Sequence, residues 1–276
     1  MSMLPGIDSD SALTQLLEQI ADQVEGLKGD DRHAYEDLEF FSRYVIGYGD
    51  SERAANSRFL KNLYEDLQFS GKNMLVLGPR GSAKSTACTI TYPAWMIGRN
   101  RILRFMLACA SMEKQGQAFG RQLDSIWTRN ERYIKIFGEL KPPQPVKWDA
   151  TEKIVLRKEP PGGMKDPTLS VVGLGTAVPS RRADQIVVDD IVTQDNAYSE
   201  IMRKTVIQFV TQTLSPILVP GGRTIVVGSS WHIADLYQIL ARMTGLQIPQ
   251  SVLIDMRRLA EIAEHGIARY GELKDA

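Results

Sequence analysis

Residues 73–86 read NMLVLGPRGSAKST, and this stretch decides the expected fold. Its first half, 73–78, is a short apolar run ending in glycine, which is typical of a buried strand. A helix is expected to follow from Lys84 to about residue 98. The same reasoning predicts further buried strands at 104–109, 185–189 and 223–228, and a hairpin from 153–157 and 169–172. Strands alternating with helices predict an α/β fold with a mainly parallel central sheet flanked by helices.

The strand runs into a phosphate-binding pattern, G-x-x-x-x-G-K-[ST], in which Ala83 replaces the second glycine. In such a loop backbone N–H groups cradle phosphate oxygens, and the following helix directs its positive end at them. Lys84 supplies a charge to the β and γ phosphates of ATP, and the Ser85 hydroxyl binds Mg²⁺. An alanine costs little at this position if its φ is negative. The expected phosphate-binding residues are Gly78, Pro79, Arg80, Gly81, Ser82, Ala83, Lys84, Ser85 and Thr86.

A pair of carboxylates ends the apolar run at 185–189. A P-loop ATPase needs one carboxylate to hold Mg²⁺ through its water shell and one to polarise the attacking water. We assign these roles to Asp189 and Asp190; the structural alternative is a strand ending in a solvated turn. The additional strand at 104–109, between the two motifs, favours the RecA-like (ASCE) branch of P-loop NTPases. The chain lacks the Asn-Lys-x-Asp guanine signature, which disfavours GTP.

Residues 223–237 read RTIVVGSSWHIADLY. A hydroxyl at the end of this strand can sense the γ-phosphate and report its loss. Together with GPRGSAKST and RRADQIVVDD, this stretch resembles the ATPase domain of tailed-phage terminase large subunits, over roughly residues 35–240. The resemblance assigns coupling roles to Ser229, Ser230, Trp231, His232 and Asp235. Without the resemblance, Trp231 and His232 read as a packed aromatic and a core histidine.

The resemblance implies a DNA-packaging motor that couples ATP hydrolysis to movement of double-stranded DNA into a viral procapsid. Its implied partners are the portal of the procapsid, the small terminase subunit and further copies of the chain in a ring. It also implies an arginine before the acidic strand that acts on the neighbouring copy's ATP. Arg181 and Arg182 are both candidates, although Pro179-Ser180 replaces the family's usual Arg-Gly; the alternative is surface arginines. Arg80 is a second candidate for a phosphate contact. The implied location is the host cytoplasm, transiently on the procapsid and not in the virion.

Length and composition allow one large domain with a substantial core: 276 residues, 43% of them hydrophobic. We expect a helical segment at 1–70, with helices at 11–27, 33–46 and 51–68, packing on the core as a small lid. The ATPase core is expected at 71–248, with a long helical stretch at 112–137. A C-terminal helix or linker is expected at 249–276, with its helix at 251–272. Terminase large subunits resemble a motor joined to a nuclease; we expect that nuclease to be missing, through truncation or a split gene, and no DNA cleavage.

Charge and cysteine content exclude several function classes. Lys+Arg and Asp+Glu number 33 each, which argues against a surface coated in basic charge and suits a monomer before docking. The two cysteines and three histidines form no zinc motif, and no apolar run is long enough to cross a membrane. We therefore expect a soluble intracellular protein.

Two other functions stay open. One is a different RecA-like DNA translocase or helicase-type ATPase, and the other is a nucleotide-binding assembly module without turnover. The adenine contacts also stay open among Phe40, Phe41, Phe59 and Gln68.

Overall fold

The computed structural model describes residues 25–48, 58–157, 163–178, 180–232 and 235–242. Within them, six strands form one sheet in the order β1-β6-β5-β2-β4-β3. The strands are β1 (Met74–Leu77), β2 (Phe105–Cys109), β3 (Glu152–Lys153), β4 (Leu169–Gly173), β5 (Ala183–Asp189) and β6 (Leu218–Gly228). All neighbouring strands are parallel except β3 and β4, which are antiparallel. The predicted mixed α/β fold with a mostly parallel sheet is confirmed.

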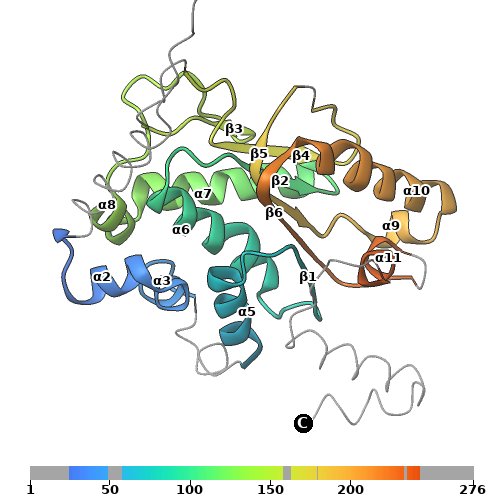
Figure 1. Ribbon diagram of the computed structural model, residues 1–276, viewed down its shortest axis with the longest axis horizontal. Coiled ribbons are helices and arrows are strands. Elements are labelled where there is room, and N and C mark those ends of the chain that lie inside the picture. The colour runs from blue at the N-terminus through green and yellow to red at the C-terminus, as the bar shows by residue number, and fades with distance from the viewer. Residues whose placement is uncertain (1–24, 49–57, 158–162, 179, 233–234, 243–276) are drawn as a thin grey trace, which may run out of the picture.

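Helices cover both faces of this sheet. The crossovers from β1 to β2 and from β2 to β4 run in one direction across the sheet, whereas the crossover from β5 to β6 runs in the other. Because parallel crossovers are right-handed, the helices they carry lie on opposite faces. In Figure 1, α6 (Tyr92–Arg99) and α7 (Gln117–Arg129) accordingly lie on one side of the strands, and α9 (Gln194–Ala197) and α10 (Glu200–Gln208) on the other.

Two stretches expected as single helices are each broken by a capping side chain. Residues 33–46 contain the end of α2 (Gly29–Glu36) and then α3 (Leu38–Tyr44), because the backbone of Asp37 is extended and its carboxylate accepts a hydrogen bond from the Phe40 N–H. The stretch 112–137 contains a π-helix (Met112–Gly116), α7 and α8 (Glu131–Phe137), and Asn130 caps α8. Capping residues start helices by satisfying unpaired N–H groups. A single capping residue hardly disturbs the spacing of apolar residues, so this spacing does not reveal the break between two helices.

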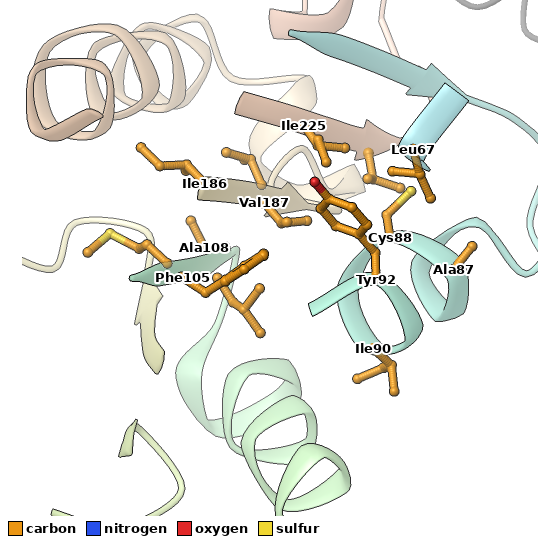
Figure 2. Close-up of a cluster of buried hydrophobic side chains, with 14 of the residues drawn as sticks. Leu67, Ala87, Cys88, Ile90, Tyr92, Phe105, Ala108, Ile186, Val187 and Ile225 are labelled. Carbon is orange, nitrogen blue, oxygen red and sulfur yellow. The ribbon is translucent and has the colours of Figure 1, made fainter. Parts of the chain in front are cut away.

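The helix after the loop packs directly on the sheet. It begins as a π-helix, η1 (Thr86–Thr91), and continues as α6. Figure 2 shows Cys88 and Tyr92 of this helix against Phe105, Val187 and Ile225 of three adjacent strands. The residues are fully buried, so the start of the helix is fixed to the sheet by the hydrophobic core.

A buried arginine fixes α5 (Arg58–Phe69) to the same sheet. Arg223 of β6 donates to the carbonyl oxygens of Leu67, Lys72 and Asp66, at 2.7, 2.6 and 3.0 Å. A guanidinium is well suited to the carbonyls at the end of a helix, where the helix dipole is negative. α5 packs on α3 and η1, so the helical N-terminal part and the sheet share one core in the described residues.

The remaining elements partly match the expectations. The predicted hairpin forms only at β3 and β4, and β4 also joins the central sheet beside β2. The crossover to β6 continues through a π-helix (Phe209–Leu214) and a 3₁₀ turn (Ser215–Ile217), and α11 (Leu236–Arg242) follows β6. The helices expected at 11–27 and 251–272 lie outside the described residues, apart from residues 25–27. None of the described helices is both long and apolar enough to cross a membrane.

Candidate functional site

Three of the predicted motifs meet at one edge of the sheet. β6 lies between β1 and β5, and the three strands are parallel, so their carboxyl ends lie side by side. Gly78 follows β1, Asp189 ends β5, and Ser229 follows β6. In open α/β sheets, ligands bind outside the carboxyl ends of the strands. The structure therefore brings the loop, the carboxylates and the third motif together where a ligand is expected.

The loop from Gly78 to Ser85 closes on itself through local hydrogen bonds. The Ser82 hydroxyl donates to the Pro79 carbonyl at 2.9 Å, and the Lys84 Nζ donates to the same oxygen at 3.2 Å. Lys84 is only 4% exposed, so its ammonium group is held inside the loop rather than in solvent. Gly81 has a φ of +81°, a backbone conformation that glycine adopts without strain.

Ala83 does not meet the condition set by the sequence analysis. Its φ is +58°, in the left-handed region, where a Cβ is unfavourable by about 1–2 kcal/mol. The substitution of the motif's second glycine is therefore not free of strain. The surrounding loop and helix must hold Ala83 in this conformation.

Asp189 is the most constrained carboxylate of the site. Its Oδ1 accepts a hydrogen bond from the Ser85 hydroxyl at 2.9 Å, and its Oδ2 accepts one from the Thr89 hydroxyl at 2.6 Å. Asp189 is 1% exposed. Burial raises the pKa of its carboxyl to about 6; the Thr89 and Ser85 hydrogen bonds oppose this rise, and neighbouring Asp190 adds to it.

This donor set suits magnesium. Mg²⁺ prefers oxygen ligands, and the Ser85 hydroxyl and the Asp189 carboxylate already meet at hydrogen-bond distance although they are 104 residues apart. Thr89 was not predicted from the sequence. Its signal was available, because Ser85 and Thr89 stand four positions apart at the start of a helix and so share a face.

Asp190 turns the chain away from the strand. Its backbone N–H donates to the Val227 carbonyl at 2.9 Å and its φ is +43°, which aspartate tolerates better than most residues. The residue is half-buried. Asp190 thus lies at the carboxyl edge beside the buried Asp189, between β5 and β6.

The third motif contacts the loop directly. The Ser229 hydroxyl donates to the Gly78 carbonyl at 2.9 Å, and the Arg80 guanidinium lies 4.8 Å from the centre of the Trp231 ring. A cation over an indole face is favourable by about 0.5–1 kcal/mol at an exposed site. The loop and the turn after β6 are therefore joined by two independent side-chain contacts.

The carboxylate of Asp235 holds the turn after β6 in place. It is fully buried, and its Oδ2 accepts hydrogen bonds from the Ser230 hydroxyl and from the N–H groups of Trp231 and His232, at 3.0, 2.9 and 3.1 Å. The ring of His232 packs edge-on against Tyr198, with 6.1 Å between ring centres. Asp235 thus fixes the backbone that presents Trp231 to Arg80.

Arg181 and Arg182 lie away from these residues. They precede β5, whereas Asp189 ends it, and seven strand residues span about 20 Å. Arg181 donates to the Ser170 hydroxyl at 2.9 Å and forms an ion pair with Glu152. Arg182 is exposed. The structure therefore brings neither arginine to the site of its own chain.

Two of the four adenine candidates have structural roles instead. Phe41 is fully buried in the core. The amide of Gln68 accepts from the Leu38 N–H and donates to the Glu36 carbonyl, both at 2.8 Å, and so joins α5 to the turn between α2 and α3.

No protein-family model matches the chain, and no curated protein matches it significantly.

The left-handed backbone at Ala83 predicts that Ala83→Gly raises the free energy of unfolding by about 0.5–1 kcal/mol. Removing the Cβ relieves strain, and the greater backbone freedom of glycine in the unfolded chain offsets part of the gain. Ala87→Gly, at a buried helical position of the same segment, is the matched control and should lower stability by about 1 kcal/mol or more. Urea unfolding of both variants measures the effects. Equal destabilisation by both would contradict a strained Ala83.

The raised pKa of Asp189 predicts a pH-dependent stability without metal. A carboxyl whose folded pKa is about 6 binds its proton more tightly in the folded state, so its contribution is complete below pH 4 and is lost as pH rises through 6. Asp189→Asn removes this titration. The stability of the variant relative to wild type should therefore rise by roughly 2–3 kcal/mol between pH 4 and 7.5 in EDTA. Urea unfolding across that range tests it, with exposed Asp195→Asn as control. A flat difference would show that burial does not disfavour the charge of Asp189.

Proposed function

We propose that this chain is a P-loop NTPase of the RecA-like branch that hydrolyses ATP with Mg²⁺. One observation carries the proposal: Ser85 and Asp189, the expected metal ligands, contact each other at the carboxyl edge of the sheet. The two side chains can make this contact only if the loop and the acidic pair each follow a parallel strand of the same sheet, as predicted. The position of β6 between the loop strand and the acidic strand also supports the RecA-like branch.

The proposed roles assign one task to each residue of the site. Lys84 and the loop N–H groups would bind the β and γ phosphates, and Ser85 and Asp189 would hold Mg²⁺, which would supply positive charge beside the phosphates. Asp190 orients a water and accepts its proton. The Ser229 hydroxyl, which donates to the carbonyl of the first loop residue, would sense the loss of the γ-phosphate. The resulting change would be transmitted to the turn formed by Ser230, Trp231, His232 and Asp235.

We further propose that the chain is the ATPase domain of a viral terminase large subunit, because its three motifs resemble those of that family. It would move double-stranded DNA into a procapsid in the host cytoplasm, as a ring docked on the portal and supplied with DNA by the small terminase subunit. The direct contacts between loop and third motif support this proposal, because coupling requires such contacts.

The arginine that completes the site would come from the neighbouring copy. Arg182 is the better candidate, because it is exposed, whereas Glu152 and Ser170 hold the Arg181 guanidinium. A guanidinium supplied in trans stabilises charge on the transferred phosphoryl group.

The proposal predicts that Lys84→Ala and Asp190→Asn each lower Mg²⁺-dependent ATP hydrolysis by on the order of 100-fold or more, since one removes a phosphate contact and the other the base. Exposed Lys61→Ala and Asp195→Asn carry the same substitutions outside the site and should retain full activity. Release of inorganic phosphate is the measurement, with and without duplex DNA. ATP binding without turnover under all conditions would favour an assembly module, and strand separation without a procapsid would favour a helicase.

A trans arginine predicts complementation between two inactive variants. Arg182→Ala keeps its own ATP site, and Lys84→Ala keeps a donor arginine. Mixing them should restore hydrolysis by on the order of tenfold over either alone, because an Arg182→Ala site receives its neighbour's arginine. An Arg181→Ala mixture is the matched comparison. No restoration in the Arg182→Ala mixture, at concentrations where wild-type activity rises steeply, would reject Arg182 as the donor.

A further inference from the structure

The Asp189 carboxylate has two side-chain donors, one on each oxygen, and they differ in surroundings. Ser85 donates to Oδ1 at the half-buried start of the helix, whereas Thr89 donates to Oδ2 and is 0% exposed. The Thr89 contact is the shorter of the two, at 2.6 Å against 2.9 Å. One oxygen of the carboxylate therefore faces the loop and the other is sealed in the protein interior.

The two hydroxyls cannot play the same part when a cation binds. A hydroxyl that turns a lone pair to a metal must leave or reorient the hydrogen bond it donates, and Ser85 is the residue that the loop offers to the metal. Its bond to Oδ1 would then be released. Thr89 lies one turn deeper and is enclosed, so its bond to Oδ2 stays in place.

The local helix geometry explains why Thr89 is available. Threonine in a helix commonly donates back to the carbonyl four residues earlier, but here its hydroxyl is directed to the sheet instead. It lies in the π-helix of residues 86–91, a wide turn that often occurs at functional sites. Buried Cys88 and Ile90 on either side leave the side chain little freedom, and β-branching restricts χ1 further.

We infer that Thr89 is a positioning residue that holds the Oδ2 oxygen of Asp189 so that Oδ1 is presented to a divalent cation bound with nucleotide. This inference rests on the proposed function, because it takes the site to bind a metal–nucleotide complex. Partners behind a metal ligand commonly change metal affinity by about 10–100-fold when they are removed. Thr89 has no contact with the cation itself in this arrangement.

Binding of Mn²⁺ in the presence of ADP tests the inference without relying on turnover. Free Mn²⁺ is measured by electron paramagnetic resonance during titration of the full chain. Thr89→Val keeps the shape of the side chain and removes the donor, and it should raise the Mn²⁺ dissociation constant by on the order of tenfold. Affinity for ADP in EDTA should not change. Thr89→Ser keeps a hydroxyl and should restore most of the affinity.

Thr91→Val is the matched control. Thr91 is equally buried in the same π-helix, and within the described residues the side-chain donors to the Asp189 carboxylate are Ser85 and Thr89. It should bind Mn²⁺ as wild type does. Thr89→Ala provides a second variant without the hydroxyl if Thr89→Val fails to fold, as judged by thermal unfolding.

The outcomes separate the inference from the proposed function. Wild-type affinity in Thr89→Val or Thr89→Ala, loss in Thr89→Ser equal to that in the valine variant, or an equal loss in Thr91→Val would each overturn the role of Thr89. ATP hydrolysis by the wild type would still stand in those cases. No Mn²⁺ binding by the wild type with ADP would overturn the metal–nucleotide site itself, and the inference with it.

Discussion

The site depends on one buried carboxylate, that of Asp189, held between a strand end and the helix after the loop. Placing an ionised group at 1% exposure is unfavourable unless hydrogen bonds and neighbouring charges compensate it. Here two hydroxyls from one helix supply the hydrogen bonds, and the positive charge of Lys84 also acts to lower the carboxyl pKa. The position of the helix is in turn fixed by its packing on β2, β5 and β6 (Figure 2). Sheet, helix and carboxylate therefore constrain one another.

The strand order then determines which segments can communicate. Because β6 separates β1 from β5, the turn after β6 must pass between the loop and the two carboxylates. Gly228 permits this close passage: a Cβ there would lie 2.1 Å from the Tyr237 hydroxyl. That hydroxyl accepts a hydrogen bond from the Val192 N–H, just after Asp190. α11 is thus tied to the chain that leaves β5, and any shift of the turn affects both sides of the site.

The apolar strands were predictable because their signal is local: residues 74–77, 105–109 and 186–188 are continuous apolar runs that the sheet buries on both faces. The order of the strands in the sheet was not predictable, because it depends on the direction of each crossover, and no local sequence pattern specifies that direction. Ser85 and Asp189 were predicted as ligands of the same metal ion, and they can meet only because the loop strand and the acidic strand lie in one sheet. The φ of Ala83 was not anticipated, since it depends on how the loop enters the helix. Thr89 was not predicted either, although its spacing of four residues from Ser85 places both hydroxyls on one face of the helix. Arg181 is the opposite case: the motif predicted a functional residue, but its side chain forms an ion pair with Glu152.

The burial of Asp189 also bears on how strongly the site would respond to a cation. Since burial disfavours the charged carboxylate, a divalent cation entering the site would relieve an existing penalty as well as form new bonds. A cation bound by the Ser85 hydroxyl would also release the hydrogen bond to Asp189 at one end of the loop, whose other end, Gly78, accepts a hydrogen bond from Ser229. A rearrangement there reaches Arg80 and, through it, Trp231 and the turn that Asp235 supports. The contacts that join the carboxylate to the third motif in the described residues are therefore the ones through which the proposed coupling would act.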